Sequence, residues 1–74
     1  MDHLAVDKID FSVFLFHKLA KAWGMMVPDT VRILNEGGII HEYILPFYDV
    51  LHTLGTDYLV EDITEMARER GVLA

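Results

Sequence analysis

The positions of glycine and proline constrain this 74-residue chain more than any other feature, because they divide it into short segments with helical periodicity. The first expected helix covers about residues 6–23 and ends at Gly24. The second begins in the sequence VPDT, with Pro28 at the first helical position, and stops at the pair Gly37 and Gly38. Each of these breaks follows a periodic apolar run, so we expect them to mark helix ends.

Residues 39–55 form a third segment, which Pro46 interrupts because proline lacks an N–H and clashes with the preceding helical turn. We expect either a kinked helix or two short helices, with Pro46 starting the second. The last helix should open with Thr56 as its N-cap and close around Arg70 and Gly71. No segment shows the alternation typical of a hairpin, so the sequence predicts an all-α fold, a small bundle of about four helices.

Spacings of three and four residues indicate which side chains are buried in these helices. The expected core stripes comprise Ile9, Val13, Phe16, Ala20 and Trp23 in the first helix, Val27, Val31 and Leu34 in the second, and Tyr58, Leu59, Ile63, Met66 and Ala67 in the last. A chain of this length forms one domain, residues 1–74, and buries only about 60% of the surface that its unfolded chain exposes. It has no cysteine for disulfides, and 53% of its residues are hydrophobic, so we expect a protein partner, a homo-oligomer or both.

Charge and hydropathy exclude two classes of partner. The formal net charge of −6 repels phosphate backbones, so we expect no nucleic-acid ligand. The longest apolar runs, such as VFLF, are far shorter than the ~20 residues that span a bilayer, and acidic residues stand where a secretory signal needs bases. We therefore expect no membrane partner and a cytoplasmic location.

Asp49 and His52 lie three residues apart in the sequence FYDVLHTLG and are the leading candidates for acid–base chemistry. If Pro46 starts a helix, Asp49 falls in its first turn and His52 in its last turn, where the helix dipole stabilises an anion and a cation respectively. Gly55 would then take the left-handed conformation that ends the helix. The spacing also allows a hydrogen bond that would orient the imidazole as a general base. Since no nucleophile or oxyanion donor lies nearby, we favour structural roles and assign no catalytic residue.

His41 and Glu42 occur in the sequence HEYIL, which lacks the second histidine of the metal motif H-E-x-x-H. A metal site would require these two side chains to converge with Asp49 or His52 through folding. We assign no metal and no cofactor. The alternative left open is a small metal-dependent or general-base hydrolase that uses Asp49 and His52.

Phe14 and Phe11 are the most informative departure from a simple amphipathic pattern. On a helical projection Phe14 lies in the middle of the polar face of the first helix and Phe11 at its edge; that face is marked by Asp7, Asp10, His17, Lys18 and Lys21. One alternative is that another segment of the chain folds over both rings. The other is that the rings anchor a partner protein or a second copy of this chain, since aromatic residues are favoured interface anchors. Both rings are therefore candidate partner-binding residues.

The sequences FYDVLHTLGTDYLVEDI and FSVFLFHKLAKAWGM resemble a small bacterial family of unknown function with a Y-D-x-L-H-T-x-G core followed by a Y-[IL]-[IV]-x-D-[IV] helix. The resemblance covers residues 11–73. Its most specific positions, which we interpret as structural, are Tyr48, Asp49, Leu51, His52, Thr53, Gly55, Tyr58, Asp62 and Ile63. The resemblance implies no activity. Genes of the family often neighbour one for a protein similar to ADP-ribosyltransferase toxins, which implies an antitoxin-like or partner role. We therefore expect a non-catalytic protein–protein interaction module.

Overall fold

A computed structural model describes residues 3–74, with side chains from residue 7 onward, and this part of the chain contains helices and turns but no strand. The predicted all-α bundle is confirmed. Its elements are α1 (His3–Trp23), α2 (Val27–Glu36), a π-helical turn η1 (Ile40–Ile44), the four-residue α3 (Tyr48–Leu51) and α4 (Thr56–Glu69).

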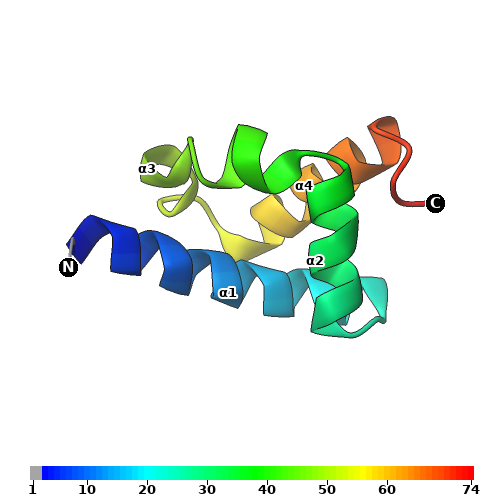
Figure 1. Cartoon of the computed structure of the whole chain (residues 1–74), viewed down its shortest axis with the longest axis horizontal. Helices are drawn as coiled ribbons and strands as arrows, with labels where there is room; N and C mark the ends of the chain where they lie inside the picture. Colours follow the sequence, from blue (N-terminus) through cyan, green and yellow to red (C-terminus); the bar gives the residue numbers. More distant parts are fainter. Residues whose placement is uncertain (1–2) are drawn as a thin grey trace.

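The long helix α1 forms one wall of the molecule, and α2 stands across it near its C-terminal end (Figure 1). The chain then returns through η1 to α3, which lies above the N-terminal half of α1, before α4 runs back toward the C-terminus. Helix α1 packs against both α2 and α4. No helix in the described range has the length and apolar character needed to cross a membrane.

Helix ends occur at the glycines that the sequence indicated. Gly24 closes α1 with a φ of 66°, a left-handed conformation that costs glycine little because it has no Cβ, and the N–H of Met25 donates to the carbonyl oxygen of Ala20 at 3.1 Å. Gly37 caps α2, and Gly38 follows with a φ of 71°. These predicted ends are confirmed.

The third segment is split rather than smoothly kinked. In η1 the hydrogen bonds are wider than in an α-helix, and the N–H of Leu45 donates to the carbonyl oxygen of Ile40 at 3.0 Å. Pro46 lies in the turn that follows, and α3 begins only at Tyr48. The split at the proline is confirmed, but the expectation that Pro46 starts the second helix is wrong.

Three further details of the helix starts differ from expectation. Pro28 is the second residue of α2, because Val27 already has helical backbone. Gly55 has a φ of −66° and a ψ of 142°, so it is extended rather than left-handed. Gly55 is also the N-cap of α4, and Thr56, the predicted cap, is its first helical residue.

The core is built mainly from leucine and isoleucine contributed by every element. Its fully or almost fully buried members are Leu15, Leu19, Leu34, Ile39, Ile44, Leu51, Leu59, Ile63 and Ala67. Several predicted core positions are wrong: Ile9, Val13 and Tyr58 are exposed, and Val27 and Val31 are only partly buried, whereas Ser12 and Thr30 are buried instead. The buried hydroxyls remain paired, because Ser12 donates to the carbonyl oxygen of Lys8 at 2.8 Å and Thr30 to that of Met26 at 3.2 Å.

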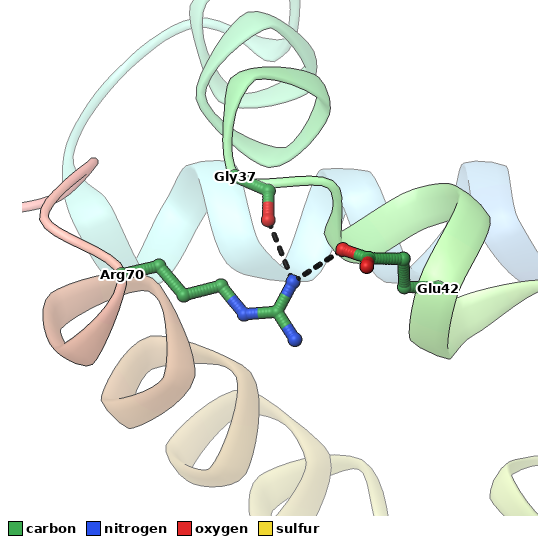
Figure 2. A network of polar contacts seen from close by, with 3 residues as sticks. All are labelled: Gly37, Glu42 and Arg70. Atoms are coloured by element: carbon green, nitrogen blue, oxygen red, sulfur yellow. Dashed lines mark hydrogen bonds and ion pairs between the residues drawn. The ribbon is translucent and has the colours of Figure 1, made fainter.

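Polar contacts join α4 to distant parts of the chain. The indole N–H of Trp23, the last residue of α1, donates to Oγ1 of Thr64 at 2.9 Å. At the C-terminal end of α4, one Nη atom of Arg70 donates to the carbonyl oxygen of Gly37 and to Oε2 of Glu42, both at 2.7 Å (Figure 2). Arg70 therefore ties the end of α4 to the turn between α2 and η1.

Candidate functional site

Tyr48 connects α3 to α1 through its ring. The ring of Phe11 meets it edge-on, with centroids 5.5 Å apart and an interplanar angle of 72°. On the other side His52 stacks on Tyr48 at 4.7 Å and 17°. Both geometries are favourable for aromatic pairs, so Tyr48 and His52 help to hold the short α3 in place.

Phe11 is therefore part of the packing within this chain. Its side chain is partly buried against the core and contacts Tyr48, so for Phe11 the structure supports the alternative that another segment folds over the ring, and not the alternative that the ring is free to anchor a partner. The reason is the helical phase: the buried face of α1 centres on Leu15 and Leu19, and Phe11 lies one turn before Leu15 on the same side.

Asp49 and His52, the candidate acid–base pair, are both exposed. Asp49 is in the first turn of α3 and His52 is its C-cap, but no hydrogen bond or ion pair joins the two side chains in the described part of the molecule. His41 is exposed too, and the carboxylate of Glu42 is paired with Arg70. Among the residues whose side chains are described, no three His, Cys, Asp or Glu side chains converge as a metal site would require.

Thr53 and Gly55 shape the turn between α3 and α4. The carbonyl oxygen of Val50, at the end of α3, accepts two hydrogen bonds from Thr53: one from the hydroxyl at 2.7 Å and one from the backbone N–H at 3.2 Å. The extended backbone of Gly55 then leads into α4, whose residue Leu59 donates its N–H to the Gly55 carbonyl oxygen at 3.1 Å.

Asp62 accepts a hydrogen bond from the phenol of Tyr43 at 2.5 Å. Partial burial and, next, this bond raise the pKa of Tyr43 to about 12, because the fold favours the neutral phenol beside a carboxylate. The Tyr43 ring also lies 5.8 Å from that of Phe47. The aspartate of the Y-[IL]-[IV]-x-D-[IV] pattern thus joins α4 to η1.

An acidic environment surrounds the Tyr48 phenol. Its pKa is raised, first by partial burial and then by the negative charges of Asp7, Asp49 and Asp10. Two of these carboxylates belong to α1 and one to α3, so the acidic end of α1 faces the start of α3.

The segment around α3 exposes four large apolar side chains, which we call the motif surface: Phe47, Val50, Leu54 and Tyr58. Val50 and Tyr58 are each 57% exposed. Phe47 and Val50 are one turn apart, and Leu54 follows in the turn after α3. Our sequence interpretation did not single out Phe47, Val50 or Leu54. The signal that could have found them is the shortness of a helix bounded by Pro46 and Gly55, which cannot bury apolar residues on all sides.

Phe14 lies where the helical projection placed it, on the solvent side of α1. Its ring is 48% exposed, and the Nζ atom of Lys18 lies 5.5 Å from the ring centroid. Ile9 and Val13 are exposed too, but at 3.6 residues per turn they point about 140° and about 100° away from Phe14 around the helix. Phe14 therefore remains a candidate partner-binding residue on a second surface.

A comparison with known families assigns the chain to a class of small proteins without a known activity. The profile of the family described as "Protein of unknown function (DUF3791)" matches residues 10–70, so the chain belongs to this family. The matched range contains the motif surface and most of α1. Searches of curated proteins and of solved structures gave no match.

Proposed function

We propose that this protein is a non-catalytic, cytoplasmic module that binds another protein through the motif surface. The observation that carries the proposal is the exposure of four large apolar side chains, Phe47, Val50, Leu54 and Tyr58, in one short segment. Exposed apolar residues are common singly, but a group of them on a small domain marks an interaction site.

The composition of the motif surface suits a binding role. Aromatic side chains such as Phe47 and Tyr58 are enriched at the centres of protein interfaces, where they bring a large apolar area at a low entropic cost. Tyr43 supports the ring of Phe47, since the two ring centroids lie 5.8 Å apart. A supported ring loses less conformational freedom on binding than a mobile one.

The charges beside the motif surface indicate the chemistry of the partner. Asp49 and Asp57 are chain neighbours of Val50 and Tyr58 and are exposed, and Asp62 lies one turn after Tyr58. With a net charge of −6 on the chain, a complementary partner presents an apolar groove with lysine or arginine at its rim.

The resemblance to a bacterial family with the Y-D-x-L-H-T-x-G core supports a more specific version of this proposal. In that version the partner is the ADP-ribosyltransferase-like protein of the neighbouring gene, and this chain acts as its antitoxin-like inhibitor. A folded surface, rather than a disordered tail, would mask the partner.

The test is co-expression with the neighbouring gene product, followed by titration calorimetry of the purified proteins. The variants Phe47→Ser and Val50→Ser should each weaken binding at least about tenfold, because both remove apolar area from the contact. Met26→Ser is the matched control, since Met26 is an exposed apolar residue outside the motif surface. Unchanged affinity in both motif-surface variants would contradict the proposed surface, and no complex at all would contradict the proposed partner.

A further inference from the structure

The solvent side of α1 has an ordered distribution of charge. Its outer face, as we call it, comprises Asp7, Asp10, Phe14, His17, Lys18 and Lys21, which fall within an arc of about 100° at 3.6 residues per turn. Acidic residues occupy its N-terminal half and basic residues its C-terminal half, with Phe14 between them. All are exposed except Asp7, which is partly buried.

Interactions within α1 do not account for this arrangement. Asp7 and Asp10 are three residues apart, as are Lys18 and Lys21, so like charges are neighbours on the helix surface, which is unfavourable in an isolated helix. The residue one turn after Asp10 and one turn before Lys18 is Phe14, so these opposite charges do not pair within the helix. Among the described side chains, Asp10, Lys18 and Lys21 form no ion pair.

The helix dipole does not account for it either. Favourable effects of the dipole fall off within the first and last turns of a helix. Helix α1 runs from His3 to Trp23, so Asp10 lies in its third turn and Lys18 more than a turn before its end. Neither ion pairs within α1 nor the helix dipole therefore explains the placement of Asp10 and Lys18 on either side of Phe14, whereas a complementary partner outside α1 would explain it.

We propose that the outer face of α1 pairs with the same face of a second copy of this chain, with the two helices antiparallel and related by a two-fold axis at Phe14. In this register Asp10 lies opposite Lys18 of the second copy, and Lys18 lies opposite its Asp10. Asp7 and Lys21 lie opposite each other in the same way. The outer face is thus complementary to itself.

The spacing of these residues matches antiparallel pairing. At a rise of 1.5 Å per residue, Asp10 lies about 6 Å before Phe14 along the helix axis and Lys18 lies about 6 Å after it. A two-fold axis at Phe14 therefore places Asp10 of one chain level with Lys18 of the other. A parallel pair of helices would bring Asp10 against Asp10 and Lys18 against Lys18, which is repulsive. A two-fold interface has this kind of self-complementary pattern.

Phe14 supplies the apolar centre of the contact. Two copies of the ring meet at the axis, and the Lys18 ammonium group, already 5.5 Å from the Phe14 ring centroid in one chain, lies between the ring and Asp10 of the second copy. A contact of one helix per chain is small, so the dimer should form in the micromolar range rather than the nanomolar range.

Sedimentation equilibrium tests the pairing directly. From about 10 µM to about 1 mM the average mass should rise from the 8.5 kDa of one chain toward twice that value. Asp10→Lys and Lys18→Asp should each weaken dimerisation about tenfold or more, because each places like charges opposite each other twice. Phe14→Ser should weaken it to a similar extent. Glu69→Lys, a charge reversal at an exposed residue of α4, should leave it unchanged.

Mixing the two charge variants gives the most specific result. The Asp10→Lys chain carries lysine at positions 10 and 18, and the Lys18→Asp chain carries aspartate at both, so each repels itself and complements the other. The mixture should form heterodimers at least about tenfold more readily than either variant forms homodimers. The double variant Asp10→Lys with Lys18→Asp should regain the wild-type dimer.

This inference goes beyond the proposed function, and its outcome is separate because the motif surface shares no residue with the outer face. Phe47→Ser should leave dimerisation unchanged, whatever its effect on partner binding. A wild-type chain that stays monomeric at about 1 mM would overturn the pairing. A dimer that persists in both charge-reversal variants, or a mixture without heterodimers, would also overturn the proposed pairing. Circular dichroism of each variant is the control that it is folded.

Discussion

Changing Tyr43 to phenylalanine should destabilise the fold by removing one hydrogen bond. The phenol of Tyr43 donates to Oδ2 of Asp62 at 2.5 Å and joins η1 to α4. Phenylalanine keeps the ring and its contact with Phe47, centroid to centroid at 5.8 Å, and removes only the hydroxyl. The variant therefore isolates this bond from the packing around it.

The raised pKa of Tyr43 sets the size of the effect. The difference between its ordinary value of 10.0 and about 12 would correspond to about 2.7 kcal/mol if fully retained. Burial, the first cause of the shift, disfavours the phenolate but does not stabilise the neutral phenol, and the ring is only partly buried, so the hydrogen bond should contribute about 1 kcal/mol at neutral pH. A domain of this size is stable by about 3–5 kcal/mol, so the loss should be measurable.

The contribution of the Tyr43 hydroxyl should also depend on pH. The pKa is higher in the folded chain than in the unfolded chain, so the fold favours the protonated phenol. The stabilisation is fully present below pH 10.0, the unfolded value, and is lost as the pH rises to about 12. The difference in unfolding free energy between wild type and Tyr43→Phe should shrink over this range.

Urea denaturation followed by circular dichroism measures this difference at neutral pH and at several pH values above 9. Tyr58→Phe is the matched control, because Tyr58 is 57% exposed and makes no hydrogen bond through its hydroxyl in the described part of the chain. In Asp62→Asn, ultraviolet absorbance of the phenolate should show Tyr43 ionising at a lower pH than in wild type. Equal stability of Tyr43→Phe and wild type at neutral pH, or a difference that does not change with pH, would refute the reasoning.

Three further substitutions have expected effects on the free energy of unfolding, each measured by urea denaturation. Ile63→Ala should lower it by about 3 kcal/mol, because Ile63 is fully buried and the change leaves a cavity; a loss below about 1 kcal/mol would contradict that packing. Gly38→Ala should cost about 1–2 kcal/mol, since its φ is 71° and a Cβ would lie 2.3 Å from Oε2 of Glu42; Gly55→Ala, where φ is −66°, is the control that should cost less. His52→Ala should cost about 0.5–1 kcal/mol through loss of the stack on Tyr48, while partner affinity per folded molecule stays unchanged; loss of affinity at full stability would contradict the structural role.

Helix ends could be predicted from the sequence because they depend on local backbone sterics. Gly24 and Gly38 have positive φ angles that other residues rarely adopt, and the sequence shows them directly. The start of α3 could not be predicted in this way. Proline is compatible with the first turn of a helix or with the turn before it, and the contact between Tyr48 and Phe11, which are 37 positions apart, is not visible in the local sequence.

The rotation of α1 about its axis was predicted only in part, for a different physical reason. Apolar residues occupy most positions from 11 to 16 and therefore point in all directions around the helix. Periodicity then defines the charged side well and the buried side poorly. Phe14, at the centre of the charged side, was placed correctly, whereas Ile9 and Val13 were assigned to the core although Leu15 and Leu19 form it.

The same limit explains why the Y-D-x-L-H-T-x-G core could not be interpreted from its polar residues alone. Asp49 and His52 drew attention because their chemistry suggests catalysis, yet His52 stacks on Tyr48 and Thr53 closes the end of α3. A four-residue helix has too few internal hydrogen bonds to persist without such contacts. Once Tyr48 and Leu51 face inward, the geometry of the turn leaves Val50 in solvent, so the contacts that fix α3 are also what present its apolar side chains outward.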